Sequence, residues 1–157
     1  MTTKRPKRNP AQFPHLDTLG AVRMANVGAK PVQERWAVAA ARLTCQPATI
    51  RALRAKALPK GDVLTVANVA GIQAAKRTSA LVPLCHPLPL DCVEILFRLR
   101  RDSVGITCAV ATSAKTGVEM EALTGASVTA LTLYDMCKAV DKTMRIEGVR
   151  VLAKAKR

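Results

Sequence analysis

Residues 93–111, which read VEILFRLRRDSVGITCAVA, decide the fold class of this chain. Apolar and polar side chains alternate from Val93 to Arg101, and this period of two is typical of a strand with one buried face. A second apolar run, residues 104–111, follows a short polar turn. The two runs therefore predict an antiparallel hairpin, one face of which must be covered by other elements.

The covering layer is predicted to be helical, because helical patterns flank the hairpin on both sides. Pro47 suits the first turn of one helix, and Asp62 can cap the next. The predicted helices cover residues 47–57, 63–81 and 117–140. Residues 35–43 are ambiguous, with a strand favoured, and residues 144–152 alternate as a last strand. These elements predict an α+β fold in which helices pack on one face of an antiparallel sheet.

The domain organisation follows from length and composition. A chain of 157 residues fits one domain, which we place at residues 15–157. Residues 1–14 are basic, rich in proline and poor in apolar side chains, so we expect a disordered basic arm that the chemistry does not need. No apolar run reaches the roughly 18 residues of a membrane span, so no membrane partner is expected.

The net charge of +14 is the strongest compositional signal. A field of that sign attracts nucleic acids, anionic membranes or small polyphosphates. Aromatic residues make up only 3% of the chain, and single-strand binders usually stack bases on aromatic side chains, so nucleic acid is the less favoured partner. The five cysteines include no C-x-x-C pair, and only two histidines are present. This composition predicts reduced thiols in a cytoplasmic protein and no zinc framework.

Polar residues in apolar surroundings are the candidates for chemistry. His86 lies between prolines that fix its backbone, and it is either a hydrogen-bonded core residue or a functional one. Asp135 and Lys138 are spaced i, i+3, which suits either an ordinary helical ion pair or a carboxylate that tunes an amine for proton transfer. Glu119 and Glu121 stand at the start of a helix, where acids are favourable. The sequence contains no glycine-rich phosphate loop, so Lys and Arg side chains would have to hold any phosphate.

Three segments resemble the cyclic pyranopterin monophosphate synthase family, also called the molybdenum cofactor biosynthesis protein C family. They read HLDTLGAVRMANVGAKPVQER, KGDVLTVANVAGIQAAKRTSALVPLCHPLPL and KTGVEMEALTGASVTALTLYDMCKAVDK, and begin at His15, Lys60 and Lys115. The resemblance covers about residues 15–154, with the blocks in family order. It implies a ferredoxin-like α+β fold for a single catalytic domain.

The resemblance also implies which residues act. Asp135 and Lys138 would form the central acid–base pair, with Lys60 as a group on a mobile loop. The implied substrate-binding residues are His86, Glu119, Met120, Glu121, Lys30, Arg35, Lys76 and Lys154. Two departures stand out. Asn26 replaces the family's aspartate, and the chain ends in LAKAKR without the family's glycine-rich tail, so Lys156 and Arg157 are expected to replace that tail if it covers phosphates.

The implied reaction is that of a lyase. It would convert 3′,8-cyclo-7,8-dihydro-GTP to cyclic pyranopterin monophosphate, a pterin, and release pyrophosphate. No cofactor is expected, and the sequence shows no carboxylate cage for Mg²⁺, although a role for Mg²⁺ in pyrophosphate departure stays open. The alternatives are a degenerate, inactive homologue, motivated by Asn26 and the short tail, and a basic nucleic-acid-binding module, motivated by the charge.

The assembly implied by the resemblance is a homohexamer, a trimer of dimers. The spacing of Glu121 and Asp135 supports sites at a dimer interface. Their fourteen-residue separation on one continuous helix places their backbones roughly 21 Å apart along its axis. Both residues could therefore serve one small substrate only if a second chain contributed one of them.

Overall fold

The computed structural model describes residues 15–17 and 19–157, and the arm predicted for residues 1–14 lies outside the described residues. Its elements are β1 (Gln33–Thr44), α1 (Pro47–Arg54), α2 (Val63–Lys76), α3 (Thr78–Leu81), β2 (Cys92–Leu99), β3 (Ser103–Ala114), α4 (Glu119–Cys137) and β4 (Arg145–Lys156). The predicted hairpin is β2 and β3, which pair antiparallel from Cys92 opposite Ala111 to Leu99 opposite Val104.

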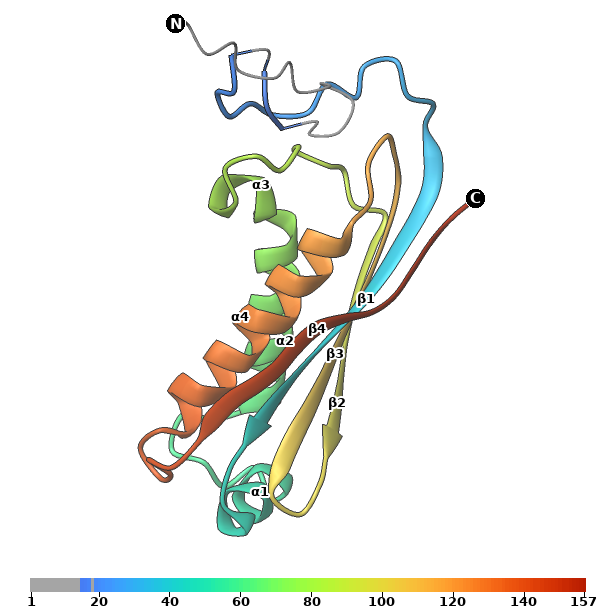
Figure 1. Ribbon diagram of the computed structural model, residues 1–157. Helices are drawn as coiled ribbons and strands as arrows, with labels where there is room; N and C mark the ends of the chain where they lie inside the picture. The colour runs from blue at the N-terminus through green and yellow to red at the C-terminus, as the bar shows by residue number, and fades with distance from the viewer. Residues whose placement is uncertain (1–14, 18) are drawn as a thin grey trace, which may run out of the picture.

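The four strands form one antiparallel sheet in the order β2-β3-β1-β4. With α2 and α4 as its two long helices, the chain runs strand, helix, strand, strand, helix, strand, which is the ferredoxin-like order. Figure 1 shows both helices on the same face of the sheet, with α1 at the end where the β2–β3 turn lies. The predicted α+β fold is confirmed.

The boundaries of α1 differ from the prediction for a reason in its backbone. The helix ends at Arg54 instead of residue 57, because Lys56 adopts a φ of 51°. The amide of Ala57 donates to the carbonyl of Ala52 at 3.0 Å, and that of Lys56 donates to Leu53 at 3.2 Å. This is the Schellman pattern, in which glycine usually occupies the left-handed position. Because position 56 is a lysine and not a glycine, no stop signal for this helix is visible in the sequence.

The other helices and strands also shift at their ends. The predicted helix over residues 63–81 is two helices, because the buried hydroxyl of Thr78 donates to the carbonyl of Ala75 at 3.0 Å and α2 ends at Lys76. The long helix α4 is shorter at both ends than residues 117–140. The strands β3 and β4 are longer than predicted, since β1 pairs with both along nearly its whole length.

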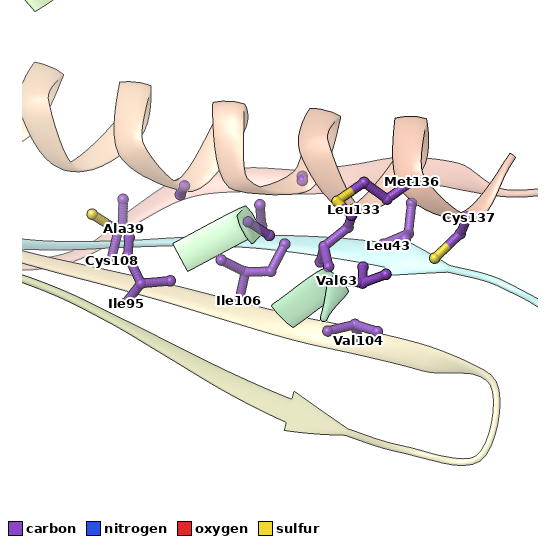
Figure 2. Packing of buried hydrophobic residues seen from close by; sticks show 14 of the residues in the cluster. Ala39, Leu43, Val63, Ile95, Val104, Ile106, Cys108, Leu133, Met136 and Cys137 are labelled. Atoms are coloured by element: carbon purple, nitrogen blue, oxygen red, sulfur yellow. The ribbon is translucent and has the colours of Figure 1, made fainter. Parts of the chain in front are cut away.

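Small side chains let α4 lie close to the sheet. Ala37, Ala39 and Ala41 point from β1 into the core and are 0–4% exposed. Ala122, Ala126 and Ala130 of α4, spaced i, i+4, are each 0% exposed and belong to the same core. Figure 2 shows larger side chains from the sheet and helices filling the rest of this layer, among them Leu43, Ile106 and Leu133. This core of small and aliphatic side chains holds the two long helices in fixed positions.

Within the described part of the chain, none of the helices is both long enough and apolar enough to cross a membrane.

Candidate active site

A carboxylate between two lysines stands at the C-terminal end of α4. The ammonium group of Lys60 lies 2.9 Å from Oδ2 of Asp135, and that of Lys138 lies 2.6 Å from Oδ1. Lys60 also donates to the backbone carbonyl of Asp135 at 3.1 Å. We call Lys60, Asp135 and Lys138 the Asp135 cluster. The structure thus brings together all three residues predicted to be catalytic.

Two different elements supply this cluster. Asp135 lies in the last turn of α4, and Lys138 is its C-cap residue, whose amide donates to the carbonyl of Tyr134 at 2.9 Å. Lys60 comes from the connection between α1 and α2, just before Gly61, which has a φ of 83°. Because Asp62 accepts a hydrogen bond from the amide of Thr65 and caps α2, the connection ends at a fixed point.

The lysines set the charge of the cluster. Hydrogen bonds from Lys138 and Lys60, together with their charges, lower the pKa of the Asp135 carboxyl to about 2. The same hydrogen bond and the charge of Asp135 raise the pKa of Lys138 above its ordinary value. At neutral pH the cluster therefore holds a carboxylate and a protonated amine within contact distance. Because the side chains are roughly half exposed, this proton donor is accessible to a ligand.

A second charged group stands at the opposite end of α4. Lys154 of β4 lies 2.8 Å from Oε1 of Glu119, the first residue of the helix. Burial alone would raise the pKa of Glu119, but the hydrogen bond from Lys154 and the charges of Lys154 and Arg35 lower it. Arg35 is held by the carbonyl of Ala114 at 3.1 Å and by Gln33 at 2.9 Å. We call Arg35, Glu119 and Lys154 the Glu119 cluster.

The remaining predicted residues near this end differ in accessibility. Glu121 is only 4% exposed, and burial raises the pKa of its carboxyl, as does the charge of Glu119. Met120 is 39% exposed. A ring nitrogen of the half-buried His86 lies 2.9 Å from the carbonyl of Ala25. The pKa of the neighbouring thiol of Cys85 is raised by burial and by the charge of Glu121, which favours a neutral packing role over a nucleophile.

Two predicted substrate-binding lysines stand apart from both clusters. Lys30 lies in the exposed turn before β1, and Lys76 is the exposed last residue of α2. Because α2 begins beside Lys60 and runs back toward the start of α4, Lys76 lies toward the same end of the molecule as the Glu119 cluster (Figure 1). Both lysines remain predicted ligands of an anionic substrate.

Two hydrogen bonds at Gly28 order the segment before β1 and connect it to Lys115, which lies shortly before α4. The side chain of Asn26 accepts a hydrogen bond from the amide of Gly28 at 2.8 Å. The ammonium of Lys115 donates to the carbonyl of Gly28 at 2.6 Å. Sequence reasoning did not single out Lys115, although it directly precedes the TGVEMEA segment. Asn26 therefore performs a hydrogen-bonding role that aspartate could also perform.

One chain does not bring its two clusters together. The helix α4 runs unbroken from Glu119 to Cys137, so its ends are separated by about 27 Å at 1.5 Å per residue. The Asp135 cluster stands at one end of it and the Glu119 cluster at the other. A small substrate bound within one chain reaches only one of them.

Among residues 15–17 and 19–157, no group of three or more His, Cys, Asp or Glu side chains is arranged to hold a metal ion. The sequence-based expectations of no zinc framework and no cofactor remain predictions, and a role for Mg²⁺ stays open.

Comparisons with known proteins cover the segments that carry both clusters. The model of the MoaC family matches residues 24–156. A cyclic pyranopterin monophosphate synthase of Chloroflexus aggregans is 52% identical over 145 residues, covering 91% of this chain and 88% of that protein. One from Nostoc sp. is 50% identical over 149 residues, covering 94% and 89%. A molybdenum cofactor biosynthesis bifunctional protein of Chlorobaculum tepidum is 56% identical over 140 residues, which are 89% of this chain but only 45% of that longer protein.

Proposed function

This chain belongs to the MoaC family, and from that premise we propose that it is a lyase of molybdenum cofactor biosynthesis. Its substrate is 3′,8-cyclo-7,8-dihydro-GTP, and its products are cyclic pyranopterin monophosphate and pyrophosphate. In the phosphate-closing step, a hydroxyl oxygen forms a bond to the α-phosphorus while the bond from that phosphorus to the leaving pyrophosphate breaks. The hydroxyl proton leaves the oxygen, so the atoms balance without an added reactant.

The Asp135 cluster is the observation that carries this proposal. Rebuilding a purine into a pterin requires several proton transfers, for which positioned acid–base side chains are the expected tools. Lys138 lies 2.6 Å from Asp135, whose carboxylate keeps its amine protonated and oriented, so Lys138 can donate a proton to an atom that becomes strongly basic during the reaction. Lys60, which contacts the other carboxylate oxygen, can orient the same substrate or donate a second proton.

The Glu119 end of the molecule suits the anionic part of the substrate. A triphosphate carries about four negative charges at neutral pH, and Arg and Lys side chains bind phosphate oxygens through charge-assisted hydrogen bonds. The strand pairing sets Arg35 opposite Lys156 and Ala37 opposite Lys154, so the three cations project from one face of the β1–β4 pair. We assign Lys30, Lys76 and Lys115 to the same anion-binding end, and His86, Met120 and Glu121 to the base and sugar.

We further propose that the complete site forms between two chains. The two clusters stand at opposite ends of α4, so a partner chain must bring its Glu119 cluster to this chain's Asp135 cluster. A two-fold pairing forms two such sites at once, since each chain gives one end and receives the other. The hexamer implied by family resemblance would contain three such dimers. We also propose that the enzyme is cytoplasmic and that the proton transfers made by its side chains need no cofactor.

The proposed function is tested with Lys138→Ala. The wild-type protein is expected to convert the cyclised GTP derivative to the cyclic phosphate pterin, with one pyrophosphate released per product. Removing the proton donor should lower kcat by about 100-fold or more, within the range typical of acid–base catalysis. Lys142→Ala is the matched control, because it removes an exposed lysine four residues away and should leave turnover unchanged.

Two results would contradict this assignment. Normal turnover by Lys138→Ala would remove Lys138 from the acid–base role. A folded wild-type protein that forms neither pterin nor pyrophosphate would instead identify a degenerate homologue. A steep loss of oligonucleotide binding with rising salt would then favour the nucleic-acid-binding alternative.

A further inference from the structure

We propose that Asp141 is a positioning residue for the Asp135 cluster, because its buried carboxylate fastens the segment that carries Lys60 to the end of the helix that carries Asp135 and Lys138. This inference rests on the proposed function of that cluster. Asp141 itself is 1% exposed and touches none of the three cluster residues in the described structure, so its effect must act through the backbone.

The carboxylate of Asp141 accepts four hydrogen bonds, two on each oxygen. Its Oδ2 accepts from the backbone amide of Gln46 at 2.7 Å and from the hydroxyl of Thr49 at 2.9 Å. Its Oδ1 accepts from the amide and the hydroxyl of Thr143 at 2.9 Å and 2.8 Å. Burial alone would raise the pKa of this carboxyl, but these hydrogen bonds outweigh it and hold the pKa at about 2. The group is therefore a permanent, fully paired carboxylate.

One side of this carboxylate holds the start of α1. Gln46 is the N-cap residue of that helix, and its own side chain makes no capping hydrogen bond. Asp141, ninety-five residues away in sequence, instead accepts from the backbone amide of this N-cap residue, as the acidic residue of a capping box does. A negative charge at this position also interacts favourably with the N-terminal dipole of the helix. From α1 the chain passes through the Schellman turn at Lys56 to Lys60, so fixing α1 fixes the base of the segment that carries Lys60.

The other side of the carboxylate holds the end of α4. The amides of Val140 and Asp141 both donate to the carbonyl of Cys137, at 2.9 Å and 3.1 Å, which forms the turn directly after Lys138. Thr143 then secures the carboxylate from the start of the path to β4. The contacts form a closed ring: Asp141 to α1, α1 to Lys60, Lys60 to Asp135, and Asp135 through the last helical turn back to Asp141.

The test compares Asp141→Asn with a matched core variant, Ile106→Ala. Asparagine keeps the size of the side chain but replaces one carboxylate oxygen with an NH₂ group, which cannot accept a hydrogen bond. The two buried donors that faced that oxygen are then left unpaired. Ile106 lies in the middle of β3 and is 1% exposed, so its truncation destabilises the fold without touching the ring. Thr49→Val removes one of the four hydrogen bonds and serves as a milder variant if Asp141→Asn does not fold.

Two quantities are measured on the full chain at a temperature where circular dichroism shows each variant folded. The first is the split between kcat and KM with the cyclised GTP derivative. The second is the titration of the Asp135 carboxyl carbon by ¹³C NMR, assigned with Asp135→Asn. The NMR readout does not depend on turnover, so a failure of the proposed function leaves this inference testable.

Asp141→Asn is expected to lower kcat by about tenfold or more while KM changes by less than about threefold, as for a misplaced catalytic group. The midpoint of the Asp135 titration should rise by about one pH unit or more toward the ordinary range as the lysines lose their position. Thr49→Val should change both in the same direction by smaller factors, and Ile106→Ala should change neither. Reduced thermal stability of Asp141→Asn with an unchanged Asp135 midpoint would overturn the inference, whatever happens to kcat.

Discussion

Asp135 contacts two lysines, and this arrangement decides which of the three residues can exchange a proton at neutral pH. With a pKa of about 2, the carboxyl of Asp135 is always ionised and cannot donate. Lys138, whose pKa is raised by that carboxylate, is always protonated in the free protein and cannot act as a base. In the proposed mechanism Lys138 is therefore the acid of the pair, and Asp135 keeps it charged and oriented. This ordering refines the acid–base pair predicted from sequence.

The alkaline limb of the pH–rate profile should report this dependence. Asp135→Asn removes the charge that raises the pKa of Lys138 and weakens the hydrogen bond, so that pKa should fall toward its ordinary value of 10.5. Since the protonated amine is the active form, kcat/KM should begin to decline at a lower pH than in the wild-type protein. Asp62→Asn is the control, because it removes the charge of an exposed Lys–Asp pair outside the cluster, with Lys56 at 3.2 Å, while asparagine keeps an oxygen that can cap α2. An unmoved limb in Asp135→Asn would assign that limb to another group.

Asn26 should tolerate replacement by the family's aspartate. Its oxygen accepts from the amide of Gly28 at 2.8 Å, and a carboxylate offers the same acceptor. Asn26→Asp should therefore change kcat/KM by less than tenfold, or about 1.4 kcal/mol. Asn26→Leu, which offers no acceptor, should be worse than either polar residue in the same assay. A gain much larger than tenfold in Asn26→Asp would mean that a carboxylate takes part in the chemistry and that this chain lacks it.

Individual contacts were predictable only where they are local in sequence. The spacing of Asp135 and Lys138 on a helix is enough to predict their ion pair, which the structure confirms. Lys60 is seventy-five residues from Asp135, and only family resemblance placed it in the site. Asp141 was not identified at all, because its four donors come from two segments whose proximity depends on the tertiary fold.

At the level of elements, periodicity predicted the types correctly and the ends poorly. The alternation of residues 93–101 and 104–111 identified β2 and β3, and Asp62 marked the start of α2. The end of α1 was missed because Lys56 adopts a left-handed conformation without being a glycine. The break at Arg77 was missed because it depends on a hydrogen bond of one threonine. Helix ends are decided by single hydrogen bonds, which residue periodicity does not encode.

The packing of α4 against both β3 and α2 depends on a helical glycine. A Cβ atom at Gly125 would lie 2.6 Å from the sulfur of Cys108 and 3.3 Å from the carbonyl of Gly71. Gly125→Ala gains about 1 kcal/mol of helix propensity, but overpacking a rigid core costs about 1–3 kcal/mol. Because Cys108 is fully buried and has little room to move, the free energy of unfolding in urea should decrease.

A double-mutant cycle with Cys108→Ala isolates this clash. Removing the sulfur should make Gly125→Ala less costly, with a coupling free energy of about 0.5 kcal/mol or more. Additive effects would show that the carbonyl of Gly71, and not the sulfur of Cys108, limits the approach of the two helices.

At the scale of the whole molecule, two exposed surfaces could bind a symmetric partner: the outer edge of β4 and the outward side of α4. Among residues 15–17 and 19–157, β4 pairs with β1 alone, so its other side is a sheet edge that no described strand covers, and Val149, Val151 and Leu152 along it are 37–50% exposed. On α4, Ala122, Ala126 and Ala130 are buried against the sheet of their own chain. The outward stripe of α4 runs through Met120 and Leu131 to Asp135, with small residues between them. A pairing of two α4 helices would therefore use this stripe.

The composite site gives a prediction that concerns the assembly alone. Glu119→Ala and Lys138→Ala damage opposite ends of α4, so each homo-oligomer should be inactive or nearly so. After subunit exchange, a mixed dimer has one site with both lesions and one site with neither, because each site takes its Glu119 cluster from one chain and its Asp135 cluster from the other. Statistical mixing in equal amounts makes half of the dimers mixed, and each mixed dimer has one intact site out of two. Activity should therefore recover to about a quarter of the wild-type value per site.

Mass spectrometry of differently labelled chains verifies the exchange, and mixing Lys138→Ala with Lys60→Ala is the control. Those two lesions lie in the same cluster, so no site in their mixed dimer is free of damage and no recovery is expected. Verified exchange without recovery in the first mixture would place each site within one chain, which the unbroken helix of 19 residues allows only if one of the two clusters does not touch the substrate.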